Sequence, residues 1–177
     1  DGKTVVVSNA GADTLSIFKI ADLPHPNVLT IKVGIEPYGV AFTPNGKFLY
    51  VANSRSNTVS VLDPTNWHLI KTIGGVGKEP RGLAITDDGE ALDNDEKVYA
   101  TQFLGVDRPG VLIGSDDYKE GRVAVIRTNN HSVIKHAVLN PIADTGFKSN
   151  GSALKGIAAD PALPRGQGNV VTSAFPN

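Results

Sequence analysis

The chain has 177 residues, 19 of them glycine and 11 proline, and its formal net charge is −1. This near-neutral balance provides no general electrostatic attraction for nucleic acid or for an anionic membrane surface. The sequence has no cysteine, which excludes disulfides, thiolate metal sites and covalent haem attachment within it. No apolar run approaches the roughly 18 residues of a membrane span.

The first predicted elements form an incomplete unit over residues 4–34. Short strands are predicted over Thr4 to Val7 and Thr14 to Ile20, with a turn between them. A more polar strand follows over Asn27 to Val33. This unit has three strands and lacks an innermost one.

A complete unit of four strands is predicted over residues 37–77. Its first two strands are separated by Pro44-Asn45-Gly46, where proline presets φ and the next two residues tolerate a positive φ. Polar turns over Ser54 to Asn57 and Asp63 to Asn66 separate the remaining strands. Val59 and Val61 alternate with polar residues, which is typical of a half-buried strand.

The same unit recurs along the chain. Val7-Ser8-Asn9 matches Val51-Ala52-Asn53, 44 positions later, and Glu36 to Gly46 matches Glu79 to Gly89, 43 positions later. A repeat of about 40–45 residues with four strands is typical of a propeller blade.

The third unit, residues 80–140, carries an acidic insertion between its first two strands. Clustered carboxylate oxygens suit a hard cation such as Ca²⁺. The predicted ligands of a calcium loop are Asp87, Asp88, Asp93, Asp95 and Glu96, with Glu90 in the same cluster. The alternative is a solvated hairpin tip whose charges discourage edge aggregation.

A second insertion in this unit runs from Phe103 to Glu120. Loops of this length in a compact domain are usually functional or disordered, and we expect this one to contact a protein partner or a neighbouring domain rather than to act as a substrate lid. Residues 152–177 are predicted to begin a fourth unit, with an innermost strand over 156–159.

The predicted fold class is therefore all-β, a β-propeller whose ring is incomplete over residues 1–177. About three and a half four-stranded antiparallel blades are counted, fewer than the 4–8 of a closed ring. Further blades of the same propeller, or other copies of the chain, are expected to supply the remainder.

The motif Tyr50-Val51-Ala52-Asn53 resembles the tetrapeptide that names the YVTN-type β-propeller repeat family, with alanine in place of threonine. The resemblance is close over Val5 to Gly89. It implies a WD40-like architecture with seven blades in a secreted protein, located in the extracellular space, in the periplasm or at the cell surface. A chain that starts at Asp1 without methionine fits either the removal of a signal peptide or a sequence trimmed at its start, and the resemblance favours export.

No catalytic set is predicted. The four histidines, His25, His68, His131 and His136, are expected at the surface, because none has a metal-binding spacing. Glu36-Pro37 and Glu79-Pro80 recur at blade entries, which favours an architectural role. Trp67 is expected to pack between blades, with ligand stacking as the alternative.

The expected function is a non-catalytic scaffold that binds a protein partner, so the chain is expected not to be an enzyme. Two alternatives remain open, since one fold hosts many functions. Some YVTN-like propellers resemble lactonases, and this alternative requires convergent polar groups or a metal in the central channel. Related propellers also accompany cytochrome-type redox modules.

Overall fold

The computed structural model describes residues 2–90, 92–111 and 118–139, and within them the chain is all-β. These residues form two compact units, the first over 2–90, 92–103 and 123–137 and the second over 104–111, 118–122 and 138–139. The single helix of the described residues is a 3₁₀ turn, η1, over Ile20–Asp22. No helix in this part of the chain is long and apolar enough to cross a membrane.

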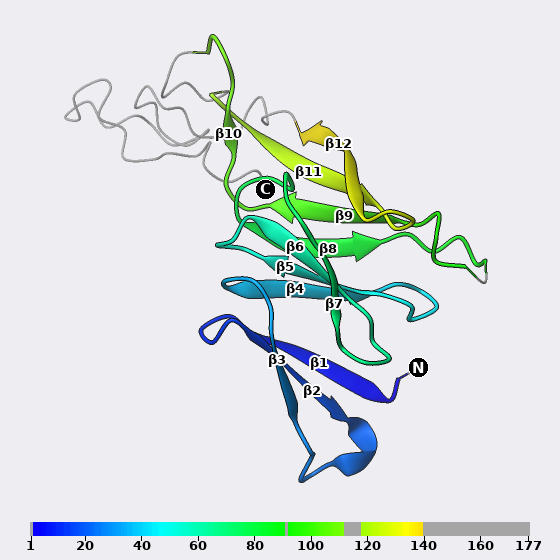
Figure 1. Cartoon of the computed structure of the whole chain (residues 1–177). Coiled ribbons are helices and arrows are strands. Elements are labelled where there is room, and N and C mark those ends of the chain that lie inside the picture. Colours follow the sequence, from blue (N-terminus) through cyan, green and yellow to red (C-terminus); the bar gives the residue numbers. More distant parts are fainter. Residues whose placement is uncertain (1, 91, 112–117, 140–177) are drawn as a thin grey trace, which may run out of the picture. The chain divides into compact units, whose positions relative to one another are not determined.

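The strands form three antiparallel sheets (Figure 1). The first has the order β1-β2-β3 and the second β4-β5-β6-β7. The third has the order β10-β11-β9-β8, with β12 also paired to β11. The strand bounds are β1 Thr4–Asn9, β2 Thr14–Lys19, β3 Leu29–Lys32, β4 Pro37–Phe42, β5 Leu49–Asn53, β6 Thr58–Leu62, β7 Leu69–Ile73, β8 Pro80–Ile85, β9 Lys97–Gln102, β10 Val106–Asp107, β11 Lys119–Arg127 and β12 Ser132–Leu139.

The turn between β4 and β5 forms where the sequence predicted it. Gly46 has φ +71°, and its N–H donates to the carbonyl oxygen of Thr43 at 2.8 Å. The N–H of Thr43 in turn donates to the carbonyl oxygen of Phe48 at 2.9 Å. Glycine is suited to this position because it has no β-carbon to clash when φ is positive.

Both faces of β5 in the second sheet are buried, so this strand lies at the centre of the core. Every residue of β5 is buried, and successive side chains point to opposite faces of a strand. Leu49 and Val51 pack in a cluster with Leu15 of the first sheet, whereas Tyr50 packs in another cluster with Val98 of the third. This is the packing expected of consecutive propeller blades.

An asparagine stabilises each of the first two sheets in the same way, Asn9 at the end of β1 and Asn53 at the end of β5. The Asn9 Nδ2 donates to Thr14 Oγ1 at 3.1 Å and to Ser16 Oγ at 2.9 Å. Asn53, which is fully buried, repeats both bonds 44 positions later, to Thr58 Oγ1 at 3.2 Å and Ser60 Oγ at 2.9 Å. The repeat found in the sequence is therefore a repeat of hydrogen bonds.

The connection between blades is also repeated. Glu36 and Glu79 both have positive φ, +57° and +49°, immediately before a proline. The N–H of Glu36 donates to Asp13 Oδ1 at 2.9 Å, and that of Glu79 donates to Asn57 Oδ1 at 2.8 Å. These two glutamates thus have the predicted architectural role, through their backbone.

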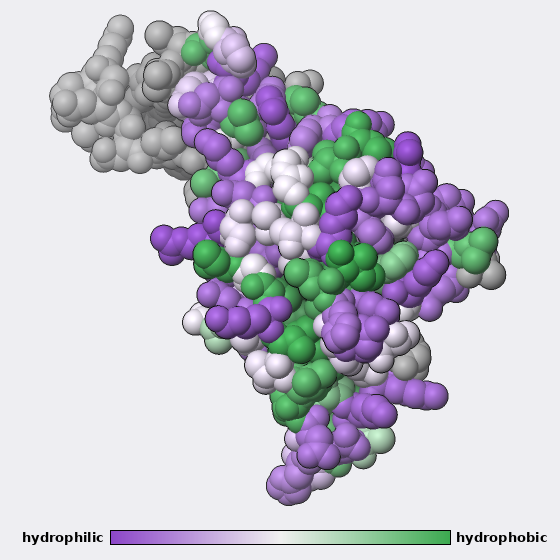
Figure 2. All heavy atoms as spheres, in the orientation of Figure 1, coloured by the Kyte–Doolittle hydropathy of each residue, from purple (hydrophilic) through white to green (hydrophobic). Residues whose placement is uncertain are grey.

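Hydrophobic side chains also reach the surface of the first two sheets (green in Figure 2). Val7 of β1 is 43% exposed, and the strand register places it with Ser16 on the face of the first sheet that is turned away from the buried Leu15. Exposed apolar surface on a sheet face is often covered by a partner in the assembled protein. This exposure agrees with blades whose ring is incomplete within the chain.

The described part of the second insertion differs from the predicted loop. Val106 pairs with Glu120 and Asp107 with Lys119, so β10 and the start of β11 extend into the predicted loop. The pair is closed by an ion pair of 3.2 Å between Lys119 Nζ and Asp107 Oδ1. The prediction failed because this pairing joins segments twelve or more residues apart. The fourth unit predicted over residues 152–177 lies outside the described residues.

Candidate functional site

Asp93 of the acidic insertion is buried and serves the fold. It is 1% exposed, and its Oδ1 accepts from the N–H and the Nδ2 of Asn45 at 3.0 and 3.1 Å. Its Oδ2 accepts from the N–H of Lys47 at 3.2 Å. Burial alone raises the pKa of Asp93, but these hydrogen bonds and one from Thr43 outweigh burial and hold the pKa below its usual value.

Glu96 is also turned inward, with 3% of its surface exposed. It accepts hydrogen bonds from the hydroxyl of Thr86 and, at 3.3 Å, from the N–H of Asp88. The alternative of a uniformly solvated hairpin tip is therefore wrong for Asp93 and Glu96. Both carboxylates satisfy backbone and side-chain donors of the turns they hold.

The remaining acids of the insertion are exposed. Oxygens of Asp88, Glu90 and Asp95 lie within 4.8 Å of one another. Asp87 instead accepts from the N–H of Gly89 at 3.0 Å. Calcium takes 6–8 oxygens, so three carboxylates that each bind through one oxygen would need carbonyls or waters to complete the shell. Calcium binding at this loop stays a prediction.

A second polar cluster lies where the inner strands β4 and β8 begin. We call it the arginine cluster, and it consists of Glu36, Tyr38, Glu79, Arg81 and Phe103. The Glu-Pro corners start both strands, and in each strand the residue after the proline contacts the preceding glutamate. The Tyr38 hydroxyl donates to Glu36 Oε1 at 3.2 Å, and Arg81 Nη2 donates to Glu79 Oε2 at 3.1 Å.

The guanidinium of Arg81 lies between two aromatic rings. Its central carbon is 3.6 Å from the ring centroid of Phe103 and 4.8 Å from that of Tyr38. Its Nε is buried and makes no hydrogen bond to any described residue. A cation held between rings is fixed in orientation, and one of its donors is left for a ligand or water.

The arginine cluster combines the groups that acid–base chemistry on a carbonyl needs. A carboxylate can accept a proton from an attacking water, and a fixed guanidinium can stabilise negative charge on oxygen. This cluster was not predicted from the sequence, because the repetition of Glu36 and Glu79 favoured an architectural role for both residues. The available signal was the equivalent position 38/81, where one blade has tyrosine and the next has arginine.

His131 corrects the expectation that all four histidines lie at the surface. It is 9% exposed, and its Nδ1 lies 2.7 Å from the hydroxyl of Tyr50. Burial lowers the pKa of His131, and the nearby Lys71 and Lys47 lower it further. Burial likewise raises the pKa of Tyr50, with a contribution from Asp93. Both groups are thus kept neutral within the core, so this pair is a packing element rather than a catalytic one.

A family model described as "Lactonase, 7-bladed beta-propeller" matches residues 1–74. A search of curated proteins finds no match. Because the matched residues are fewer than half of the chain, the match supports the propeller fold and leaves full membership of the family to be established.

Solved structures with propeller folds are similar to the chain. A putative 6-phosphogluconolactonase from Bacteroides uniformis is 21% identical, with a TM-score of 0.52 over 80% of this chain and 39% of that one. The dihydro-heme d1 dehydrogenase NirN in complex with DHE is 21% identical, with a TM-score of 0.52 over 83% and 26%. Hydrazine synthase from Kuenenia stuttgartiensis is 22% identical, with a TM-score of 0.47 over 79% and 47%. The chain thus spans less than half the length of each.

These findings confirm the all-β propeller fold and correct the expected function. The expectation of a non-catalytic scaffold, and of a chain that is not an enzyme, was wrong, because the matching family model describes a lactonase. The reason for the error is physical. Blade repetition reports the architecture that the repeats share, and it does not report positions where the repeats differ, such as Tyr38 and Arg81.

Proposed function

We propose that this chain is the propeller sequence of a lactonase-type enzyme that hydrolyses a cyclic ester at the arginine cluster. The observation that carries the proposal is the match of residues 1–74 to the lactonase family model. The seven-bladed ring and the YVTN-type repeat are part of the same proposal, supported by the repeat spacing and by Tyr50-Val51-Ala52-Asn53.

The proposed reaction opens the ring of a lactone with water. The water oxygen bonds to the ring carbonyl carbon, the bond from that carbon to the ring oxygen breaks, and a hydroxy acid is formed. A carboxylate removes a proton from the attacking water and then gives it to the departing ring oxygen, while a cation stabilises the negative charge that develops on the carbonyl oxygen.

We assign the base to Glu36 and the cation to Arg81. Glu79 is engaged by Arg81 at 3.1 Å, which leaves Glu36 as the carboxylate without a cationic partner among the described residues. The Tyr38 hydroxyl donates to Glu36 Oε1 and orients the carboxylate. The rings of Tyr38 and Phe103 hold the guanidinium in place, so that little reorganisation is needed during the reaction.

The test is hydrolysis of a panel of γ- and δ-lactones by the protein that contains this chain, followed in a pH-stat. Glu36→Gln is expected to lower kcat by about 10²–10⁴-fold and Arg81→Lys by about 10²–10³-fold. Glu90→Gln, an exposed carboxylate of the acidic insertion, is the matched control and should leave the rate unchanged. Hydrolysis no faster than the uncatalysed rate, or a Glu36→Gln variant as active as the parent protein, would refute the proposal.

A further inference from the structure

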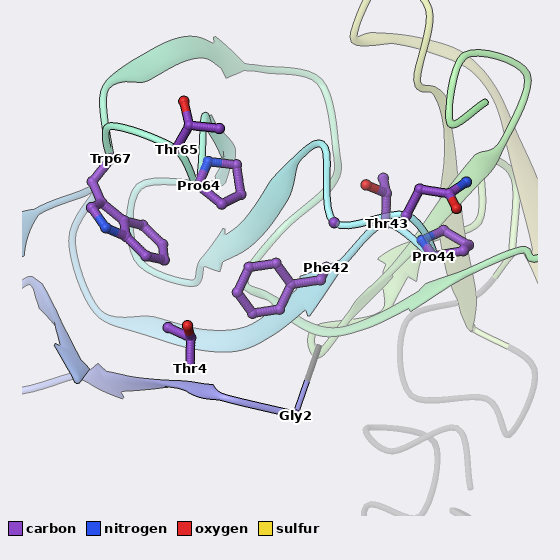
Figure 3. A pocket seen from close by; sticks show the side chains of 10 residues that line it. Gly2, Thr4, Phe42, Thr43, Pro44, Pro64, Thr65 and Trp67 are labelled. Atoms are coloured by element: carbon purple, nitrogen blue, oxygen red, sulfur yellow. The ribbon is translucent and has the colours of Figure 1, made fainter. Parts of the chain in front are cut away.

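A pocket lies between the first two sheets, at the opposite end of β4 from the arginine cluster. Its volume is about 430 Å³, within the range of small-molecule sites. We call it the Trp67 pocket, and the lining residues that matter here are Thr4, Phe42, Pro44, Pro64, Thr65 and Trp67. Figure 3 shows the Trp67 and Phe42 rings on one side of the first sheet, with Thr4 facing them.

The pocket is separate from the proposed lactonase site. Tyr38 stands near the start of β4 and Phe42 at its end, which places them ~13 Å apart along an extended strand. A ligand in the Trp67 pocket therefore does not depend on the reaction proposed for the arginine cluster.

The equivalent space between the second and third sheets is filled by protein. There the His131 ring packs edge-on against Phe48, with centroids 4.7 Å apart, and bonds to the Tyr50 hydroxyl. Thr4 stands 44 positions before Phe48, as Val6 does before Tyr50. The pocket thus exists because two aromatic side chains are replaced by smaller ones.

Trp67 occupies the place that His131 has in the next sheet. Both residues stand in the turn before the outer strand, and both have positive φ, +62° and +50°. For a bulky side chain this backbone conformation is unusual and is retained where the surroundings demand it. The turn holds the indole toward the pocket, where it also contacts the core cluster of Leu15 and Leu49.

The chemistry of the lining selects a neutral ligand. None of the described lining residues is charged, and burying a charge without a partner is costly. The Thr65 hydroxyl is already bonded to Asp63 at 2.7 Å. The Thr4 hydroxyl and the Trp67 indole N–H, in contrast, make no hydrogen bond to another described residue. A purely apolar ligand would leave these two groups unpaired.

We propose that the Trp67 pocket binds a neutral sugar ring. The C–H face of such a ring packs on the Trp67 and Phe42 side chains, and its hydroxyls pair with Thr4 and the indole N–H. The size, the missing charge and the two open polar groups all agree with this class of ligand.

The test uses the fluorescence of Trp67, which is the one tryptophan in the 177-residue sequence. The full chain is titrated with neutral methyl glycosides, with glucuronate and with benzyl alcohol. A saturable emission change is expected with the glycosides. Thr4→Phe, which installs the residue found at position 48, should weaken binding by about tenfold or more. Thr30→Phe, the same change at an exposed position of β3, should leave binding unchanged.

Three results would overturn this proposal: no saturable change with any neutral glycoside, a stronger response to glucuronate or benzyl alcohol, or an unaltered titration of Thr4→Phe. Thermal unfolding establishes that the variants are folded. Should Thr4→Phe fail to fold, Thr4→Val removes only the hydroxyl at nearly constant volume. Calorimetry must then show weaker glycoside binding to Thr4→Val than to the parent chain, and equal binding would refute the proposal.

Discussion

Gly39 of β4 lies so close to the carbonyl oxygen of Arg81 on β8 that a β-carbon has no room between them. The obstruction is backbone, which cannot rotate away as a flexible side chain could. Gly39 does not have a positive φ, so the requirement for glycine at this position is one of space alone. The close approach of the two inner strands brings Tyr38 and Arg81 into contact.

Gly39→Ala is expected to destabilise the protein by about 1–3 kcal/mol, because β4 and β8 must move apart to admit the methyl group. Gly11→Ala is the matched control, since a β-carbon there meets nothing within 4 Å. Urea unfolding of both variants measures the difference. Equal free energies of unfolding for the two would contradict the close approach.

Asp93→Ala should lower the free energy of unfolding by about 1.5–3 kcal/mol, because it removes a buried, charged acceptor that ties the acidic insertion to the β4–β5 turn. Asp95→Ala removes an exposed carboxylate and should change stability by no more than about 0.5 kcal/mol. Denaturant melts of both variants at pH 7 make the comparison. If Asp95→Ala lowered the free energy of unfolding and Asp93→Ala did not, the structural role assigned to Asp93 would be wrong.

His131 makes stability fall as the pH is lowered below neutrality. Its native pKa lies below the ordinary 6.5, so the unfolded state takes up the proton first, and stability is lost from about pH 6.5 down to the native pKa. The pKa of Asp93 is also lowered, but from the ordinary value of a carboxyl group, 3.8. The stability that the charged Asp93 contributes is therefore lost only when the pH falls below about 3.8.

Thermal melts between pH 8 and 5 check the His131 effect. A His131→Asn variant should have a lower melting temperature at pH 8 and a flatter pH profile between pH 8 and 5. A profile of the variant as steep as that of the parent protein would assign the pH dependence to another group.

Asn53→Ala is expected to cost about 1–3 kcal/mol for each buried donor or acceptor it leaves unpaired. Its side chain bonds to Thr58 and Ser60, and its Oδ1 also accepts from the N–H of Gly34 at 3.1 Å. Asn9→Ala is the internal comparison. Asn9 makes the two corresponding side-chain bonds but is only partly buried, so its loss should cost less in the same chemical denaturation experiment.

Calcium binding can be tested at the acidic insertion by calorimetry. Any bound ion should depend on Asp88 and Asp95 rather than on Asp93, whose oxygens are occupied by donors from the protein. Asp95→Asn is therefore expected to weaken calcium binding. If titration of the parent chain with calcium gives no binding heat, the prediction of a calcium site is wrong.

The second sheet could be predicted almost entirely from local sequence. Its turns carry their own signals, such as Pro44-Asn45-Gly46, and Val59 and Val61 marked β6 as a strand. The expected half-burial of β6 was wrong, because Ser60 between the two valines is buried as well. The paired strands of the second insertion could not, because Lys119 and Glu120 are polar and their partners Val106 and Asp107 are distant in sequence.

The same limit applies to the candidate sites. Burial of His131 depends on Tyr50, 81 residues away, and no pattern near His131 reports it. Arg81 and Tyr38 come together only because two inner strands lie side by side. The repeat indicates which positions are equivalent, whereas the proposed site lies where equivalent positions carry different residues and meet in space.

The connector that enters each inner strand bonds to the blade before it and to the blade it begins. In the connector before β4, the N–H of Glu36 donates to Asp13 of the preceding blade, and the N–H of Gly34 donates to Asn53 of the following blade. Nearest-neighbour coupling of this kind makes blades open cooperatively rather than one at a time. Amide hydrogen exchange should therefore be slowest in the blade of β4 to β7, which is hydrogen-bonded to a neighbouring blade on each side. Destabilising either neighbouring blade should make exchange in β4 to β7 faster.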